Sequence, residues 1–212
     1  MSQPTQREIV FFASAQSCVL DFMTAFAQPT PRAPMDAAID QFGLRANLIG
    51  EETTEFFTAE DKVDMLDGLC DLLYVSIGTY ITCGEPLESF SRYAQHKGVL
   101  TAAAEAKKQL TLQYCEKGLR EKISTLCLSV IRAGNALVGD EKFSSAFYAV
   151  HWNNMEKFWT EAEVKSVEPL KRYVATFVPS LSHEARCWRV VNADGKVTKS
   201  PNHQKVDLTD YI

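Results

Sequence analysis

The sequence predicts an all-α fold, an antiparallel helical bundle that ends in a small C-terminal β-hairpin. Three observations support this prediction. Apolar residues recur at helical spacing from about residue 17 to about residue 150. The stretch from Asp61 to Thr82 is apolar on most of its circumference, which is typical of a buried helix. After Pro169 the pattern changes to two short strand-like segments around a Gly-containing turn at 192–195, which is typical of a hairpin.

Apolar spacing and stop signals give the helices in order. The predicted helices span Ser17–Ala27, Ala37–Thr58 and Asp61–Thr82, with further helices from Leu87 to about Val150 that break near residues 117–118 and 138–140. The sequence Cys83-Gly84-Glu85-Pro86 ends the third helix. The Ala-rich run Thr101–Lys108 has high helix propensity but few large apolar residues, so we expect it to face solvent.

Composition and charge exclude several classes of protein. With 212 residues, 46% of them apolar and 23% charged, the chain can bury the core of one globular domain over residues 1–212. Its 22 basic and 27 acidic residues give a formal charge of −5, which argues against a nucleic-acid partner. A small anionic substrate would need a metal ion or a local basic cluster to bind to such a chain.

The cysteines and the apolar runs indicate a cytoplasmic protein without a membrane partner. The six cysteines form no C-x-x-C pair and have no zinc-ligand spacing with the four histidines. The polar N-terminus, Met1–Arg7, lacks the apolar core of a signal peptide. The longest apolar stretch, Leu72–Cys83, is interrupted by small and polar residues and is too short to span a bilayer.

Carboxylates are concentrated on the second and third predicted helices. The six acids are Glu51, Glu52, Glu55, Asp64, Asp67 and Asp71. Spacings of three and four residues put the glutamates on neighbouring faces of one helix and the aspartates on one stripe of the next. The connection between the two helices is only a few residues long, so they must run antiparallel, with both acidic sets near one level.

Two interpretations of these acids are open. Acid-rich helical faces are usually solvated, and the three glutamates alone fit that interpretation. The aspartates lie on an otherwise apolar helix, where unpaired carboxylates are costly unless a cation compensates them. An oxygen-only ligand set suits Mg²⁺ or Mn²⁺, and Mg²⁺ commonly bridges carboxylates to substrate phosphates. Neither a P-loop nor a Rossmann glycine motif is present, so metal-assisted phosphoryl chemistry is the favoured prediction.

Three segments, the first of which contains two acidic motifs, resemble one family in the right order. Leu48-Ile49-Gly50-Glu51-Glu52-x-x-Glu55, followed by Leu66-Asp67-Gly68-Leu69-Cys70-Asp71-Leu72-Leu73-Tyr74-Val75, resembles the acidic motifs of the all-α nucleoside triphosphate pyrophosphohydrolases, which include the MazG-like enzymes. Two later segments are similar to parts of the phosphoribosyl-ATP pyrophosphohydrolase-like branch. They are Val150-His151-Trp152-Asn153-Asn154-Met155-Glu156-Lys157 and Asp194-Gly195-Lys196-Val197-x-Lys199-x-Pro201.

The resemblance implies an all-α pyrophosphohydrolase fold, a homodimer or homotetramer, and Mg²⁺, with Mn²⁺ as a possible substitute, held by the two acidic motifs. By position, Glu52 and Glu55 match the E-x-x-E ligands and are the candidate catalytic residues, with Glu55 the better candidate for orienting the attacking water. Asp71 matches the last acid of the second motif. Glu51 also belongs to the candidate metal ligands.

Two features depart from the family pattern. The second motif is usually E-x-x-D, but the residue three before Asp71 is Gly68. Asp67 or Asp64 could replace the missing acid, and the sequence leaves both open. The segment from about residue 88 to 145 is longer than the link that this branch typically has. We expect it to be a helical insertion that forms a lid or covers a surface that simpler members bury by oligomerising.

Cationic and amide groups in the matched segments are candidates for binding phosphate or substrate. They are Asn154, Lys157, Lys196 and Lys199, together with Tyr74 of the second motif. Asn154 and Lys157 are three residues apart and are expected on one helical face, whereas the other two lysines come from the hairpin at 186–200. A single lysine is more often a surface residue, and only its place in a matched segment favours phosphate binding.

Other residues near these motifs have structural interpretations. His151 is expected to be a hydrogen-bonded structural residue. Arg45 lies a turn and a half before the first glutamate and could pair with the acidic cluster. Trp152, Trp159 and Trp188 are expected to be core or interface residues, with base stacking as the alternative.

The sequence therefore predicts a Mg²⁺-dependent nucleotide pyrophosphohydrolase, which cleaves a ribo- or deoxyribonucleoside triphosphate to the monophosphate and pyrophosphate. Phosphoribosyl-ATP or a modified nucleotide is the alternative substrate. A non-catalytic helical interaction module that kept the scaffold is the alternative from another class, because Gly68 replaces an expected acid. A dimer or larger assembly is predicted because the third helix is too apolar for one thin layer of neighbours to cover.

Overall fold

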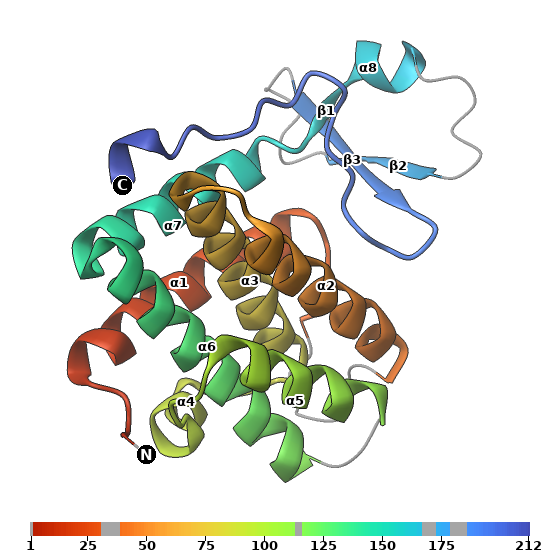
Figure 1. Cartoon of the computed structure of the whole chain (residues 1–212). Helices are drawn as coiled ribbons and strands as arrows, with labels where there is room; N and C mark the ends of the chain where they lie inside the picture. The colour runs from red at the N-terminus through yellow and green to blue at the C-terminus, as the bar shows by residue number, and fades with distance from the viewer. Residues whose placement is uncertain (1, 31–38, 113–115, 167–172, 179–185) are drawn as a thin grey trace. The chain divides into compact units, whose positions relative to one another are not determined.

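The fold is mostly helical, as the sequence predicts. The computed structural model describes residues 2–30, 39–112, 116–166, 173–178 and 186–212. Within these residues eight α-helices make up most of the chain, and three short strands near the C-terminus form an antiparallel sheet (Figure 1). The chain divides into two compact units, Met1–Val150 with Asp207–Ile212, and His151–Val206. The expectation that residues 1–212 act as one domain stays a prediction.

The first unit is a bundle of helices. It contains α1 (Gln6–Ala25), α2 (Ile39–Thr58), α3 (Lys62–Thr82), α4 (Leu87–Tyr93), α5 (Val99–Thr111), α6 (Glu116–Val138), most of α7 (Asp140–Met155) and the short 3-10 helix η2 (Thr209–Tyr211). The predicted helices 37–58 and 61–82 correspond to α2 and α3, although residues 37–38 lie outside the described residues. The predicted break near 138–140 is confirmed, since Gly139 has a φ of 90°. The break near 117–118 was misplaced, because α6 runs through it.

Helix α1 begins eleven residues earlier than the predicted start at Ser17, because a capping box stabilises its first turn. The Thr5 backbone N–H donates to a Glu8 carboxylate oxygen at 2.6 Å, and the Glu8 N–H donates to the Thr5 hydroxyl. By length and composition alone α1 could cross a membrane, which for a single helix is weak evidence. One face of α1 packs in the core, where the Phe12 ring stacks on Phe90 at 3.9 Å and lies edge-on to Tyr80.

Helix α3 is the centre of the first unit and is covered within the chain. It packs against α1, α2 and α6, and 14 of its residues are buried. Ion pairs fasten α6 to its surroundings: Arg120 pairs with Glu85 at 2.8 Å and Arg132 pairs with Glu8 at 2.7 Å. The predicted reason for a dimer therefore does not hold, because residues of the 88–145 segment supply the cover that α3 needs.

Helix α5 corrects the expectation that Thr101–Lys108 faces solvent. Ala102, Ala103 and Ala106 are buried, and the helix packs against α2 and α6. Alanine is a weak core residue by area, but its small side chain lets helix axes approach closely. A prediction that looks for large apolar anchors misses this kind of packing.

The second unit is built around a three-stranded antiparallel sheet with the order β1-β3-β2. Its elements are the end of α7, β1 (Trp159–Thr160), α8 (Glu161–Ser166), β2 (Tyr173–Phe177) and β3 (Arg186–Asn192). The predicted turn at 192–195 forms, with a 3.0 Å bond from the Asn192 N–H to the Lys196 carbonyl. Among the residues that the structure describes, the returning chain adds one isolated bridge, Val191 with Val197, and the regular partners of β3 are the unpredicted strands β1 and β2.

Candidate active site

Two glycines of α3 define how α3 packs on α2. A Cβ placed on Gly68 would lie 2.9 Å from the Phe56 Cα, and a Cβ placed on Gly78 would lie 2.8 Å from Nη1 of Arg45. As residue numbers rise along α3, the matching numbers on α2 fall. The two helices are therefore antiparallel, as predicted, and their backbones approach closely at Gly68.

This register selects one acid on each helix. Because an α-helix repeats every 3.6 residues, the positions of α3 that share the side of Gly68 and Gly78 include Asp71. The positions of α2 that share the side of Arg45 and Phe56 include Glu52 by the same argument. Counting from the Gly68–Phe56 contact puts Glu52 level with Asp71. Both side chains are half-buried, which fits their position at the edge of the helix–helix contact.

Two more acids lie along the same edge of the α2–α3 pair. At about 100° per residue, Glu55 and Asp67 both project to the side on which Glu52 and Asp71 lie, within about one turn of them. Glu55 is exposed and Asp67 is half-buried. We call Glu52, Glu55, Asp67 and Asp71 the acidic edge.

The two remaining predicted ligands lie apart from this set. Glu51 is exposed and points further outward from α2 than Glu55 does. Asp64 lies in the first turn of α3, where its backbone N–H donates to the Asp61 carboxylate at 2.9 Å. Its side chain is exposed near the connection between the helices.

The acidic edge has the donor chemistry for Mg²⁺, since it offers carboxylate oxygens alone on two facing helices. Within the part of the chain that the structure describes, no three carboxylates, imidazoles or thiols converge closely enough to hold a metal ion. Carboxylates without a cation repel one another, so some separation is expected. The residues fit the ion by type and by placement, and their side chains would have to converge around it.

Gly68 explains why the usual glutamate of the second motif is missing. Its missing Cβ leaves room for the Phe56 backbone of α2. A glutamate here would push the helices apart or force its own side chain out of the contact. The glycine therefore removes a ligand but lets α2 and α3 approach more closely. On the acidic edge, the acid nearest in sequence to position 68 is Asp67.

The sequence analysis suggested that Arg45 could pair with the acidic cluster. In the structure its side chain does not point toward these acids. It is buried with a 4% exposed fraction, its guanidinium lies against Gly78, and Nη2 donates to the Gln28 side chain at 3.3 Å. Burial lowers the pKa of Arg45 to about 10. This arginine stays charged at neutral pH inside the α2–α3 contact, where it supports the helix pair and not a substrate.

One cation near α2 was missed by the sequence analysis. The ammonium of Lys107 on α5 lies over Gly50, since a Cβ placed there would be only 2.6 Å from Nζ. Gly50 and Glu55 are about 140° apart around the helix, so this lysine lies on the flank opposite the acidic edge. Lys107 therefore does not complete the acidic site. In the sequence, the only signal for this contact would have been Gly50, whose lack of a side chain leaves room for the lysine.

The predicted phosphate-binding residues all belong to the second unit, apart from Tyr74. Asn154 is buried in the last turn of α7. Lys157 lies past the helix end, in a turn in which its N–H donates to the Asn154 carbonyl at 3.2 Å. The expectation that both lie on one helical face is therefore wrong. Lys196 is half-buried and Lys199 is exposed on the chain that follows the turn after β3.

A buried carboxylate, missed by the sequence analysis, organises the second unit. Glu163 of α8, with a 6% exposed fraction, accepts hydrogen bonds from the Thr160 N–H at 2.7 Å and from the Asn202 amide at 2.8 Å. Nη1 of Arg186 lies 3.1 Å from the same carboxylate and donates to the Ser200 hydroxyl at 2.9 Å. Burial alone would raise the pKa of Glu163, but these bonds and Arg186 outweigh it and lower the pKa to about 2.

Several aromatic side chains have clear positions. Tyr74 is buried on α3, with its ring 5.5 Å from Phe22 and 5.7 Å from Phe147, which is a core environment. His151 is buried, which agrees with a structural role, and its predicted hydrogen bond stays a prediction; the neighbouring Trp152 is 67% exposed and is not a core residue. Trp159 is buried, and its indole N–H donates to the Thr198 carbonyl at 2.9 Å.

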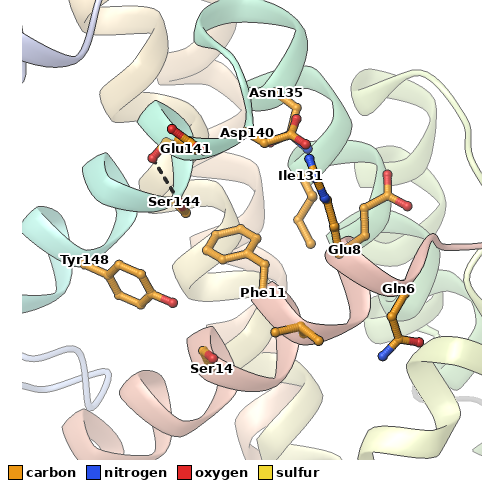
Figure 2. A pocket seen from close by; sticks show the side chains of 12 residues that line it. Gln6, Glu8, Phe11, Ser14, Ile131, Asn135, Asp140, Glu141, Ser144 and Tyr148 are labelled. Carbon is orange, nitrogen blue, oxygen red and sulfur yellow. Dashed lines mark hydrogen bonds between the residues drawn. The ribbon is translucent and has the colours of Figure 1, made fainter.

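The first unit also contains an open cavity of about 420 Å³ between α1, α6 and α7. Figure 2 shows Phe11 and Tyr148 in its wall and Asp140 and Glu141 at one end. None of the predicted site residues lines it. It has both signs of charge at its rim, since Arg7 also contributes.

The helical fold agrees with one class of protein, the all-α nucleoside triphosphate pyrophosphohydrolases, and residues 19–97 match a family model that belongs to this superfamily. Within that class, the family model that matches these residues is described as phosphoribosyl-ATP pyrophosphohydrolase. The match includes α2, α3 and all six predicted acids, but less than half of the chain. Members of the family are pyrophosphohydrolases and typically depend on Mg²⁺. No curated protein and no solved structure matches the chain significantly.

Proposed function

We propose that this chain hydrolyses a nucleoside triphosphate, ribo- or deoxyribo-, to the nucleoside monophosphate and pyrophosphate with Mg²⁺ or Mn²⁺. The supporting observation is the register of α2 on α3, which puts Glu52, Glu55, Asp67 and Asp71 along one edge. That edge lies within the residues that match the family model.

Glu52 and Asp71 are the primary ligands in this proposal, because they lie at one level on facing sides of the helices. Asp67 replaces the glutamate that the family pattern usually has at the position of Gly68. Asp64 is the less favourable choice because it lies nearer the helix connection. Glu55 is exposed, which leaves it accessible to accept a hydrogen bond from a water and to orient that water for attack. When bound, Mg²⁺ would offset phosphate charge and lower the pKa of a bound water.

The cationic and amide groups of the matched segments keep the role that the family resemblance implies. Lys157, Lys196, Lys199 and Asn154 are proposed to bind the phosphate oxygens of the substrate. They offset the formal charge of −5, which would otherwise repel a polyphosphate. Tyr74, also a predicted substrate contact, has a ring packed between Phe22 and Phe147, so a core role is better supported for it.

Phosphoribosyl-ATP is the second candidate substrate, because it appears in the description of the family model that matches residues 19–97. It contains the same kind of phosphoanhydride bond, so the roles proposed above apply unchanged. A non-catalytic module that kept the scaffold is the remaining alternative. It is supported by the loss of one acid at Gly68.

A product assay separates these possibilities. The full chain is incubated with Mg²⁺ and, in turn, with each common ribo- and deoxyribonucleoside triphosphate and with phosphoribosyl-ATP. We expect pyrophosphate and a monophosphate from at least one of them, and no product when EDTA replaces the metal. Sequential release of orthophosphate would contradict the proposal. A lack of product from the whole panel would favour the non-catalytic module.

Location and assembly are proposed on separate grounds. The described cysteines, Cys18, Cys70, Cys83, Cys127 and Cys187, are free thiols, which agrees with a reducing cytoplasm. The proposal of a homodimer or homotetramer now depends on the family resemblance alone, because α6 covers α3 within the chain. Sedimentation at micromolar concentration will test the assembly, and a monomer would remove it from the proposal.

A further inference from the structure

The cavity between α1, α6 and α7 is built from firmly connected parts of the first unit. Arg132 of α6 donates hydrogen bonds to the Glu8 carboxylate at 2.7 Å and to the Gln3 carbonyl at 2.9 Å. These bonds fasten the start of α1 to α6. On the other side, a Cβ placed on Gly134 of α6 would lie 2.3 Å from the Phe143 ring of α7. Because its walls are held in this way, the cavity exists before any ligand binds, as most small-molecule sites do.

Aromatic and aliphatic side chains form most of the wall. The Phe11 ring lies 6.3 Å from the Tyr148 ring, with an angle of 87° between their planes, and Figure 2 shows both side chains at the cavity. Ile131 is buried beneath them, and Val10 adds an apolar surface that is 56% exposed. The volume of about 420 Å³ lies within the range of small-molecule sites, about 300–1,000 Å³. The cavity therefore has the room and the apolar surface for the body of a small organic molecule.

Charged side chains of both signs line the same cavity without pairing with one another. Arg7, Asp140 and Glu141 are exposed, and within the ranges that the structure describes none of them forms an ion pair. The fourth charged residue of the lining, Glu8, already pairs with Arg132 at 2.7 Å. Two carboxylates and one guanidinium are thus left for a ligand, and the ligand that complements them carries both signs of charge itself.

Ligands of other charge fit this lining less well. The phosphates of a nucleotide would meet Asp140 and Glu141, and like charges repel. A simple amine would satisfy these acids but leave its positive charge near Arg7. An uncharged apolar molecule would take water from all three groups and offer them no partner, which is unfavourable.

We propose that this cavity binds a free α-amino acid with an apolar side chain. The ammonium group pairs with Asp140 and Glu141, the carboxylate pairs with Arg7, and the side chain packs against Phe11 and Tyr148. This binding goes beyond the proposed hydrolysis, because the ligand has no phosphate and requires no metal ion. None of its contacts belongs to the acidic edge.

Three molecules with the same phenyl body test the two charges separately. Phenylalanine carries both charges, phenethylamine only the ammonium group, and 3-phenylpropionate only the carboxylate. Each is titrated into the full chain with EDTA present and without nucleotide, and binding is followed by two-dimensional NMR. We expect phenylalanine to bind with a Kd of about 1 mM or below, the order for a ligand of this size. Each analogue should bind about tenfold more weakly, because one charge-assisted interaction is lost.

Three results of this titration would overturn the proposal. They are no binding of phenylalanine up to about 10 mM, equal affinity for all three molecules, and equal affinity for phenylalanine and phenylalaninamide. Phenylalaninamide has the charge of the N-terminal residue of a peptide, so equal binding would assign the cavity to a peptide end and not to a free amino acid.

Variants of the exposed charges assign each contact. Arg7→Gln should abolish the preference for phenylalanine over phenethylamine, because the carboxylate has lost its partner. Asp140→Asn combined with Glu141→Gln should abolish the preference over 3-phenylpropionate. Glu88→Gln is the matched control, since Glu88 is also an exposed acid in the first turn of a helix, and it should change neither preference. If Arg7→Gln kept the full preference over phenethylamine, the site would be rejected.

The result does not depend on the hydrolysis assay. If phenylalanine binds with these preferences but no nucleotide is hydrolysed, the amino-acid site stands and the proposed function fails. If nucleotides are hydrolysed but phenylalanine does not bind, the proposed function stands and this site fails. Asp71→Asn separates the two sites further, since it should leave the affinity for phenylalanine unchanged, and a tenfold loss in this variant would place phenylalanine at the acidic edge instead.

Discussion

The two units of this protein hold their candidate functional groups in different ways. In the first unit, the acidic edge lies beside a helix–helix contact made by glycines and apolar side chains. In the second unit, the segment that carries Lys199 is held by a buried polar network around Glu163. Packing supports one region and hydrogen bonding supports the other.

The difference has consequences for mutation and for pH. Side chains at the edge of an apolar helix–helix contact can be substituted without loss of that contact. Substitutions there should therefore change activity with little change in the free energy of unfolding. A polar network loses several bonds when one member is removed, so function and stability change together. The three tryptophans, Trp152, Trp159 and Trp188, all lie in the second unit, and most helix lies in the first. Tryptophan fluorescence and far-UV circular dichroism can therefore follow the two units separately.

The largest expected effect is on catalysis. Glu55→Gln and Glu52→Gln should each lower kcat by at least ~100-fold, the order expected when a water loses its positioning or its base. The circular dichroism melt should change little, because Gln has nearly the helix propensity of Glu. Steady-state kinetics with the best substrate of the panel give the measurement. Wild-type turnover in both variants would mean that the acidic edge is only a solvated face.

The next effect tests whether Asp71 binds a cation. Without metal, Asp71→Asn should leave the protein at least as stable, because it removes repulsion from Asp67 and Glu52. With Mg²⁺ at a hundredfold excess over Kd, the wild type should gain about 2.7 kcal/mol, and the variant should lose most of that gain. Thermal melts of both proteins with Mg²⁺ and with EDTA give the comparison. An equal gain for wild type and variant would exclude Asp71 as a ligand.

The close contact between α2 and α3 can be tested with substitutions of two glycines. Gly68→Ala puts a Cβ 2.9 Å from the Phe56 Cα and should destabilise the first unit by about 2 kcal/mol, as overpacking of a rigid contact does. Gly43→Ala in α2 meets no atom within 4 Å and should stabilise it by about 0.5–1 kcal/mol. Denaturation followed by circular dichroism measures both. A destabilised Gly68→Ala variant together with a stabilised Gly43→Ala variant would support the close contact. Stabilisation of both variants would refute it.

The network of the second unit is tested by two glutamates of α8. Glu163→Gln leaves Arg186 without its carboxylate and should cost about 1–3 kcal/mol, seen as an earlier fluorescence transition. Glu161→Gln removes only an exposed partner of Lys165 and should change stability by less than about 0.5 kcal/mol. A smaller loss for Glu163→Gln than for Glu161→Gln would show that the network does not hold this unit.

The same network predicts a pH dependence. The pKa of Glu163 is about 2 in the folded unit, below its ordinary value of 4.5. A carboxyl with a lowered pKa stabilises the fold above pH 4.5, and this contribution is lost as the pH falls toward 2. Fluorescence-monitored unfolding from pH 6 to pH 2 should therefore show an acid-induced loss in wild type. Glu163→Gln should show a much smaller one.

Secondary structure and the choice of candidate acids were accessible from sequence because both depend on local spacing. The boundaries of α2 and α3, and the two acidic sets on them, follow from apolar periodicity and from positions three and four apart. The failures occurred where a local pattern has two tertiary outcomes. Alanines can face solvent or mediate close packing, as Ala102 and Ala106 do, and Arg45 could reach an acid or lie in the core.

The sequence by itself determined an all-α chain with six carboxylates on two antiparallel helices, since periodicity and a short connection leave little freedom there. Only the tertiary structure decided that Glu52, Glu55, Asp67 and Asp71 share one edge, because that depends on the rotation of each helix about its axis, which Gly68 and Gly78 set through contacts with α2. Only the tertiary structure brought Ser200, Asn202 and Gln204 to Arg186, Glu163 and Asn153. Their meeting depends on bonds from Glu163 and Asn153 to a segment about 40 to 50 residues away, and no local pattern encodes those bonds.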